Sequence, residues 1–427
     1  MTHHVILGAG PAGVIAAETI RKHAPRDHIT LVGDEPHLPY SRMAIPYLLI
    51  GQIGEQGTYL RKGADHYERL GIERVAGRAR GVDTAARTVF LDDGRVLPFD
   101  RLLIATGSHP VKPPIPGIDL PGVHHCWTLD DARAIMQRAQ PGARVLQLGA
   151  GFIGCIIMEA LQLRGVQLTV VEMGDRMVPR MMGPAAGGMI RRWCEAKGVA
   201  VHTGTRLERI EPGAGGALVV QLSGGQRVEA ELVIIAAGVR PAIGFLQDSG
   251  IQCLLGVLTD EHMQTNVPGI YAAGDCAEAF DKVSGTTIVS AIQPNAAEQA
   301  RVAALNMVGQ PAELRGVTQI NVLDTLGLIS ASFGQWQGVP GGQRIETIDE
   351  AHHRVISLAF DDDVMVGCNS VGWTQHIGAL RGLVEGRVRL GPWKQRLLQD
   401  PTQFMAAYLD RAQAQSGWSG PGDVHRR

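Results

Sequence analysis

One arrangement of residues occurs twice in this chain: a short apolar strand, a glycine-rich turn, an apolar helix, a second strand and then an acidic residue. The first copy occupies residues 5–35 and the second residues 145–172. Strands that alternate with helices in this way form parallel sheets, with helices covering their faces. The duplication therefore predicts an α/β fold with two doubly wound, Rossmann-type dinucleotide-binding domains.

The two glycine-rich turns are suited to binding the pyrophosphate of a dinucleotide. In such a turn the first glycine allows the tight bend, the second lets the backbone approach the phosphates, and the third lets helix and strand pack closely. The helix N-terminus then faces the phosphates, and the later acid can bind ribose hydroxyls. The candidate residues are Gly8, Gly10, Pro11, Ala12, Gly13, Asp34 and Glu35 in the first copy, and Gly149, Gly151, Phe152, Ile153, Gly154 and Glu172 in the second, with Gly238 further along.

Two such units imply two dinucleotides, and the natural chemical pairing is a flavin with a nicotinamide. Glu172 favours NADH over NADPH, because a carboxylate accepts from a 2′-hydroxyl and repels a 2′-phosphate. Arg176 and Arg180 follow closely and weaken that preference if they reach the phosphate. The two glycine-rich turns alone do not decide which unit holds which cofactor.

The composition is that of an ordinary globular protein of 427 residues, with 45% apolar and 19% charged side chains. The net charge of −2 provides no field that would attract nucleic acid or an anionic membrane. No apolar run approaches the ~18 residues of a membrane-spanning helix, and no signal peptide is evident. The six cysteines lie far apart, which indicates neither a zinc site nor a disulfide framework. We expect a cytoplasmic protein without a metal.

Four motifs together resemble the FAD-dependent pyridine nucleotide-disulfide oxidoreductase superfamily, and within it the ferredoxin/rubredoxin reductase, nitrite reductase and NADH oxidase branch. They are the first glycine-rich turn, the strand end Ala105-Thr106-Gly107, the second turn with Glu172, and Gly274-Asp275. The resemblance implies that the first unit binds FAD and the second NADH. It also implies that Asp275 contacts the ribityl chain of FAD and that Ala105, Thr106, Gly107 and Gly274 lie at the same cofactor.

The resemblance and the proline- and glycine-rich boundaries predict a split FAD domain. We expect its first part at 1–110, an NAD(H) domain at 111–240, the second part of the FAD domain at 241–316, a C-terminal α+β dimerisation or interface domain at 317–412, and a disordered tail at 413–427. In the C-terminal domain we expect strands within 317–333, 344–348 and 355–360, followed by a helix at 376–385.

The chain lacks the redox-active cysteine of several relatives. No cysteine occurs in residues 1–125. In NADH peroxidases, NADH oxidases and CoA-disulfide reductases, a single redox cysteine lies in a stretch that aligns with residues 39–47, and Met43 takes its position here. A thioether cannot form a thiolate or a sulfenic acid, so this chemistry is lost. Dithiol chemistry of the glutathione reductase type is excluded as well.

A second departure concerns residues beside the flavin. Similar ferredoxin and rubredoxin reductases pair a lysine with a glutamate there, and the matching positions are Tyr47 and Ile156. Losing both avoids an unpaired buried charge, which costs about 3–5 kcal/mol. Tyr47 either stacks on or gates the flavin, or is a core tyrosine. Arg42 either contacts the FAD pyrophosphate or is a solvated loop arginine, and His376 is the candidate to reach the flavin from the C-terminal domain.

The expected function is that of an FAD-dependent NAD(P)H oxidoreductase, which passes electrons from NADH through FAD to a ferredoxin- or rubredoxin-like protein or a partner subunit. The alternatives are reduction of a small acceptor (a quinone, a sulfur species or oxygen) and a non-catalytic flavoprotein that assembles a complex. We expect a homodimer or a subunit of a redox complex.

Three further features are candidate sites. Cys155 lies at a helix N-terminus, where thiol pKa values fall, although Cys155 and Cys276 are expected to be packing residues. Basic residues between Arg381 and Arg396 form either a docking site for an acidic carrier or a solvated face.

Overall fold

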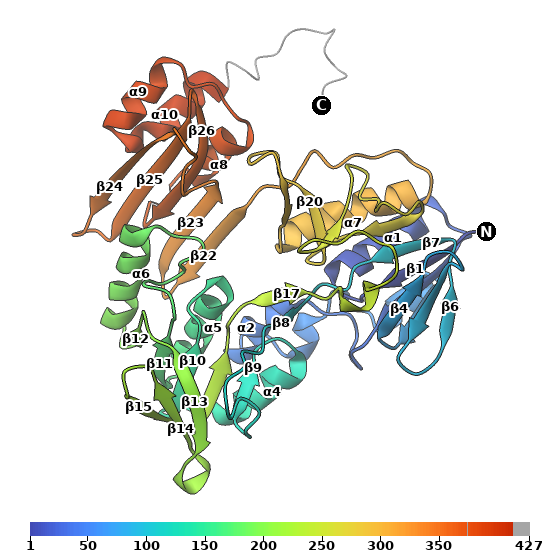
Figure 1. Ribbon diagram of the computed structural model, residues 1–427, viewed down its shortest axis with the longest axis horizontal. Coiled ribbons are helices and arrows are strands. Elements are labelled where there is room, and N and C mark those ends of the chain that lie inside the picture. Colours follow the sequence, from blue (N-terminus) through green and yellow to red (C-terminus); the bar gives the residue numbers. More distant parts are fainter. Residues whose placement is uncertain (374, 413–427) are drawn as a thin grey trace. The chain divides into compact units, whose positions relative to one another are not determined.

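The computed structural model describes residues 1–373 and 375–412 (Figure 1). The predicted disordered tail, 413–427, lies outside the described residues. The chain divides into two compact units. Unit 1 contains residues 1–148, 160–167 and 207–317, and unit 2 contains residues 149–159, 168–206 and the chain from Thr318 onward.

Unit 1 is built on a parallel sheet that contains the first glycine-rich turn. Its strand order is β19 (Ile270–Ala272), β7 (Arg101–Ile104), β1 (His3–Leu7), β2 (His28–Gly33) and β3 (Ile72–Ala76). All four pairings are parallel. Helices α1 (Pro11–His23) and α7 (Gln293–Met307) pack against each other and against this sheet (Figure 1). The apolar side chains of β1 are fully buried, as expected for a central strand covered on both faces.

The remaining elements of unit 1 form further sheets and short helices. Strands β9 (Val123–His125), β16 (Leu232–Ile235) and β10 (Arg144–Leu148) pair in parallel, and β10 leads into the second glycine-rich turn. The antiparallel groups are β4 (Ala79–Asp83), β5 (Thr88–Leu91) and β6 (Val96–Pro98); β8 (Ser108–Pro110) with β17 (Val239–Pro241); and β13 (Leu207–Pro212), β14 (Leu218–Leu222) and β15 (Arg227–Ala230). The last group is β18 (Val257–Leu258), β20 (Ala277–Phe280) and β21 (Thr287–Val289), and the helices are α2 (Ile45–Leu49), α3 (His66–Arg69) and α4 (Leu129–Arg138).

Unit 2 combines the second glycine-rich turn with the C-terminal sheet. Strand β11 (Gln167–Val171) pairs in parallel with β12 (Ala200–His202), and helices α5 (Phe152–Leu163) and α6 (Pro184–Ala196) follow the turn and β11 respectively. The C-terminal sheet is antiparallel, in the order β22 (Ile320–Thr325), β23 (Leu328–Gly334), β26 (Val364–Val371), β25 (Arg354–Asp361) and β24 (Gln343–Asp349). Helices α8 (Ile377–Glu385), α9 (Pro392–Gln399) and α10 (Phe404–Ala407) complete it, and α8 packs on β23 and β26.

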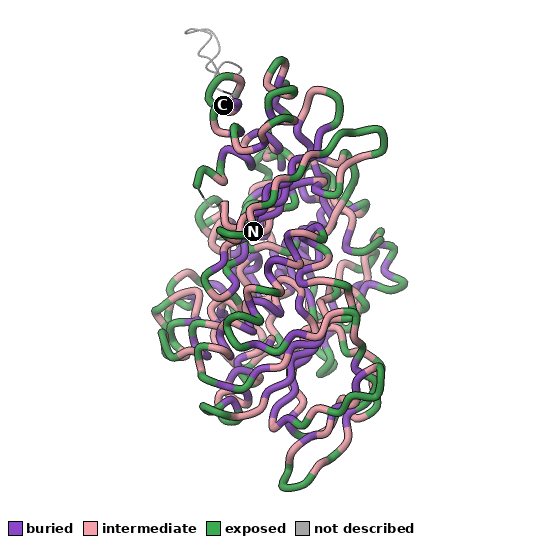
Figure 2. Tube along the Cα trace, turned by 90° about the vertical axis from the view of Figure 1, so that its left-hand side faces the viewer, coloured by how far each residue is buried: buried purple, intermediate pink, exposed green. Residues whose placement is uncertain are grey.

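Buried residues concentrate along the strands, and exposed ones in the turns (Figure 2). The expected strands and helix of the C-terminal domain are present, with one correction: the sequence analysis missed β26. This strand carries Gly367, Asn369 and Ser370, which read as turn residues, yet Asn369 and Ser370 are buried. Within the described residues, no helix is both long and apolar enough to cross a membrane.

Candidate dinucleotide sites

The three glycines of the first turn meet different surroundings. A Cβ on Gly8 would lie 2.0 Å from the carbonyl oxygen of Ala105, and Gly8 has a φ of +112°. A Cβ on Gly13 would lie 1.9 Å from the carbonyl oxygen of Gly8. A Cβ on Gly10 would meet no atom within 4 Å. Protein packing therefore requires glycine at positions 8 and 13, whereas the space at Gly10 is open for a ligand.

The start of α1 suits a pyrophosphate. Gly10 is the N-cap residue, no side chain caps the helix, Pro11 occupies the first turn, and that turn contains no acidic residue. The first four backbone N–H groups of a helix have no intrahelical partner, and the helix dipole makes this end positive. The open space at Gly10 and these donors fit the phosphates of a dinucleotide.

The two acids after β2 have different partners. Asp34 pairs with Arg78 at 2.7 Å, and both side chains are exposed. Glu35 accepts a hydrogen bond from the Tyr40 hydroxyl at 2.5 Å and from Arg42 Nη2 at 2.6 Å. Glu35 is therefore the acid that is held in a fixed position after the strand, as a ribose ligand must be.

Arg42 is committed to contacts inside unit 1. Besides Glu35, it donates to the Tyr40 hydroxyl at 2.9 Å and to the Trp127 carbonyl at 2.7 Å. Its guanidinium also stacks on the Trp127 ring, 5.2 Å from the ring centre. The interpretation of Arg42 as a solvated loop arginine is therefore wrong, and its pyrophosphate role stays a prediction.

The motif around Asp275 adjoins the first turn. The Gly274 N–H donates to Gln299 Oε1 at 2.8 Å, and a Cβ on Gly274 would lie 3.3 Å from Ala12 Cβ. Asp275 accepts from the Ser108 hydroxyl at 2.8 Å, and burial raises the pKa of its carboxyl. Thr106 and Gly107, at the end of β7, both hydrogen-bond Ala242. Ser108 and Gln299 carry no spacing signal, so the sequence analysis could not find them.

The second turn repeats this pattern. Gly149 has a φ of +105° and donates its N–H to the Val171 carbonyl at 2.8 Å. A Cβ on Gly151, like one on Gly10, would meet no atom within 4 Å. Glu172 accepts from the N–H of Ala150 at 2.8 Å and from that of Gly174 at 2.7 Å. A second open turn thus lies beside a second fixed carboxylate.

The other candidate residues of this site differ in burial. At the start of α5, Phe152, Ile153 and Ile156 are partly buried and Gly154 is buried. Gly238 belongs to unit 1, where its carbonyl accepts from the Val111 N–H.

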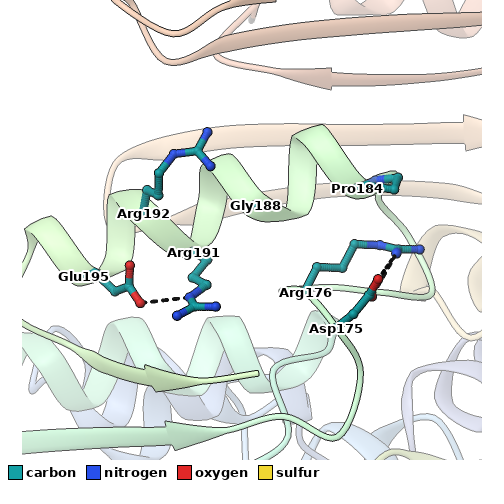
Figure 3. A pocket seen from close by; sticks show the side chains of 7 residues that line it. All are labelled: Asp175, Arg176, Pro184, Gly188, Arg191, Arg192 and Glu195. Carbon is teal, nitrogen blue, oxygen red and sulfur yellow. Dashed lines mark hydrogen bonds and ion pairs between the residues drawn. The ribbon is translucent and has the colours of Figure 1, made fainter. Parts of the chain in front are cut away.

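A hollow of about 330 Å³ lies between α6 and the loop that follows Glu172 (Figure 3). Each arginine that lines it is paired with a carboxylate. Arg176 pairs with Asp175 at 2.8 Å, Arg191 with Glu195 at 2.8 Å, and Arg192 with Glu350 at 2.8 Å. Arg176 also donates to the Met182 carbonyl. Because its charge is already balanced, Arg176 is poorly placed to attract a 2′-phosphate, which supports the preference of Glu172 for NADH.

Residues 2–304 match the family model of the pyridine nucleotide-disulphide oxidoreductases. The chain belongs to this family. It is 32% identical to the epsilon subunit of NADH-dependent phenylglyoxylate dehydrogenase from Aromatoleum evansii, over 94% of this chain and 95% of that protein. It is 33% identical to the ferredoxin–NAD(+) reductase component of the biphenyl dioxygenase system from Paraburkholderia xenovorans, over 72% and 74%.

A solved structure extends the similarity through the C-terminal sheet. A chain of the covalent putidaredoxin reductase–putidaredoxin complex superimposes with a TM-score of 0.87 at 25% identity, covering 96% of this chain and 99% of that chain. These findings confirm the predicted superfamily and fold class, the oxidoreductase class, and the use of FAD and NADH.

The residues at the positions of the missing cysteine and the missing lysine are exposed. Met43 is 52% exposed and Tyr47 is 53% exposed, one helical turn apart. The interpretation of Tyr47 as a core tyrosine is therefore wrong. His376 is exposed as well, with a φ of +62° at the start of α8. The catalytic roles of Tyr47, Ile156 and His376 stay predictions.

Five of the six cysteines are buried, and Cys253 is partly buried. Cys155 is buried, as expected of a packing residue, and burial raises the pKa of its thiol despite its place at a helix N-terminus. Burial likewise raises the pKa of Cys276, and it raises that of Cys126 to about 12. Across residues 1–373 and 375–412, no group of three His, Cys, Asp or Glu residues is arranged to hold a metal ion.

Proposed function

We propose that this chain oxidises NADH with a bound FAD and passes the electrons to a redox-protein partner. The observation that carries the proposal is the pair of open glycine turns, at Gly10 and Gly151, each beside a fixed carboxylate. When bound, FAD accepts a hydride from a nicotinamide and can release electrons one at a time. No thiol is available as an intermediate carrier at the position of the family's redox cysteine, because the first cysteine of the chain is Cys126 and that thiol is buried.

The protein residues then act by binding and orientation. The start of α1 holds the FAD pyrophosphate, Glu35 accepts from its adenosine ribose, and Asp275 accepts from a ribityl hydroxyl. Gly151 leaves room for the NADH pyrophosphate, and Glu172 accepts from its adenosine 2′-hydroxyl. We assign residues 1–110 and 241–316 to FAD binding, 111–240 to NADH binding and 317–412 to an interface domain.

The names of two relatives favour a protein acceptor. One is a subunit of an NADH-dependent dehydrogenase and the other a ferredoxin–NAD(+) reductase component, and the first is matched over 95% of its length. We therefore propose that this chain works in the cytoplasm with a ferredoxin-like protein or as a subunit of a larger redox complex, with a homodimer as the alternative assembly.

A small acceptor is the second candidate. Met43 and Tyr47 form an exposed apolar pair at the position that the family resemblance places beside the flavin. An exposed apolar surface suits a planar apolar acceptor such as a quinone better than a charged carrier.

An anaerobic titration of the purified protein with NADH, and separately with NADPH, tests the common part of both candidates. Bleaching of the flavin absorbance by one equivalent of NADH supports the proposal, whereas unreduced or absent flavin contradicts it and leaves a non-catalytic role. Turnover with a ferredoxin that weakens as salt is added identifies a charged protein acceptor. Faster turnover with a quinone, independent of salt, identifies the small acceptor instead.

A further inference from the structure

A buried amide of the C-terminal sheet contacts the loop that follows Glu172. Asn369, on the central strand β26, is 1% exposed. Its Oδ1 accepts from the Gly183 N–H at 2.8 Å, and its Nδ2 donates to the Met181 carbonyl at 2.9 Å. The side chain thus pairs with two alternate backbone groups of the loop, as a neighbouring strand would do. Nδ2 also reaches Ser332 Oγ at 3.2 Å.

The segment that Asn369 holds contains a strained residue. Val178 is buried and has a φ of +50°, although it is β-branched and precedes Pro179. Such a conformation costs about 1–3 kcal/mol and persists only where the surroundings enforce it. The Val178 carbonyl accepts from the N–H groups of Met181 and Met182, both at 2.9 Å. Asn369 therefore fixes the residues that close the strained turn.

The same turn contacts the second glycine-rich turn. The Val178 N–H donates to the Ala150 carbonyl at 2.8 Å, while the Ala150 N–H donates to Glu172 Oε2 at 2.8 Å. Ala150 thus lies between the candidate ribose acid on one side and the strained turn on the other. A set of hydrogen bonds therefore connects β26, through the strained turn, to the backbone of the second glycine-rich turn, and all of it lies within unit 2.

Stability alone does not explain this choice of residue. Burying an amide costs free energy unless all of its polar atoms are hydrogen-bonded. An apolar residue of similar volume fills a sheet core at a lower desolvation cost. The amide is instead suited to pairing with irregular backbone, because it offers a donor and an acceptor side by side. Its two loop bonds define the path of the chain between Pro179 and the start of α6.

We propose that Asn369 is a positioning residue for dinucleotide recognition by the second turn. It holds residues 178–183 in the strained shape that keeps Ala150 and Glu172 in place for the adenosine ribose. This inference rests on the proposed function, because it assigns NADH to the second turn. It makes the C-terminal sheet a part of the NADH site.

Binding of ADP-ribose to the FAD-loaded protein tests the inference, since ADP-ribose carries the ribose and pyrophosphate but cannot reduce the flavin. We expect Asn369→Leu to weaken ADP-ribose binding about tenfold, the effect of losing roughly one net hydrogen bond between the displaced turn or Glu172 and the ligand. FAD content and the rate of flavin reduction at saturating NADH are expected to stay at the wild-type level. The matched control is Ser332→Ala, which removes one partner of Asn369 but leaves both loop bonds, and we expect wild-type affinity from it.

The result that overturns the inference is an Asn369→Leu protein with a lowered melting temperature but an ADP-ribose affinity within about twofold of the wild type. If that variant does not fold, Asn369→Asp decides, because it keeps the acceptor for Gly183 and replaces the donor to Met181 with a repelling oxygen. A folded Asn369→Asp protein with wild-type affinity overturns the inference as well. Wild-type protein that binds no ADP-ribose contradicts the proposed function instead.

Discussion

Alanine at Gly10 and at Gly13 is expected to damage different properties of the protein. At Gly13 a Cβ would lie 1.9 Å from the Gly8 carbonyl oxygen, where ordinary contact begins near 3.4 Å, so Gly13 and the turn at Gly8 would have to separate by about 1.5 Å. At Gly10 a Cβ meets nothing within 4 Å, and the backbone has an ordinary φ of −78°. Only the first substitution clashes with the protein itself.

The energies follow from these surroundings. Overpacking costs about 1–3 kcal/mol, and a backbone oxygen that cannot rotate away places Gly13→Ala at or above the upper end. At Gly10, alanine is a poorer N-cap than glycine, but it also lowers the entropy of the unfolded chain, and these effects of about 0.5–1 kcal/mol oppose each other. A methyl group in the space expected for the pyrophosphate removes one or two charge-assisted hydrogen bonds. Each bond is worth about 1.5–3 kcal/mol, so each bond lost lowers the affinity for FAD roughly 10- to 100-fold.

Thermal unfolding of the FAD-free proteins and titration with FAD, followed by flavin fluorescence, separate the two effects. We expect Gly10→Ala to unfold at nearly the wild-type temperature and to bind FAD weakly, and Gly13→Ala to be destabilised before any cofactor is added. Gly151→Ala, with the same open surroundings in the second turn, controls for the substitution and should leave FAD binding intact. A Gly10→Ala protein with wild-type FAD affinity would refute the argument that the open space belongs to the pyrophosphate.

Three further predictions concern charge and thiols. Glu172→Gln should lower the selectivity for NADH over NADPH about tenfold, because it removes the charge that repels a 2′-phosphate; unchanged selectivity argues against a ribose role. Burial raises the pKa of the Asp275 carboxyl in the folded protein. The protonated carboxyl therefore contributes to folding stability at low pH, and this contribution is lost as the pH rises through the pKa of the folded state. Asp275→Asn should therefore raise the melting temperature of the FAD-free protein at pH 7, with a gain that disappears in acid, and it should weaken FAD binding. N-Ethylmaleimide at pH 8 should spare Cys126, whose pKa of about 12 leaves on the order of 10⁻⁴ as thiolate. Labelling should be confined to the partly buried Cys253 and should not slow flavin reduction by NADH, whereas a slower reduction would indicate a working thiol.

The parts of this fold that follow from local pattern could be predicted from the sequence. Positions 8 and 13 require glycine because a side chain there would clash with the chain just after β7 and with the turn itself. The spacing of a strand, a turn and a helix in the sequence is enough to predict these close contacts. The start of β26 is apolar, but Asn369 and Ser370 interrupt the pattern, so the strand was missed. The buried Asn369 amide has partners far away in the chain, such as Ser332 and Met181. No local window contains that information.

The same limit explains the errors at single residues. The place of Cys155 at a helix N-terminus favours a low thiol pKa, but burial of the side chain raises that pKa. Tyr47 was judged by residue type, but its exposure depends on what covers α2. The pyrophosphate role of Arg42 stays a prediction, and its partner Trp127 lies 85 positions away in the sequence. A motif thus indicates which residues are candidates for a site, but it does not predict which distant residues will surround them.

The two dinucleotide sites are supported by the same physical device. In unit 1, the Gln299 amide of α7 accepts from the Gly274 N–H beside the first turn. In unit 2, the Asn369 amide of β26 pairs with the loop behind the second turn. Each turn adjoins irregular backbone, at Gly274 and at residues 181–183, and a buried side-chain amide pairs with that backbone. A side-chain amide on a helix or strand therefore holds irregular backbone in one position more firmly than a bound water molecule would. Because the two amides come from different elements, a substitution at one is expected to weaken one cofactor site and spare the other.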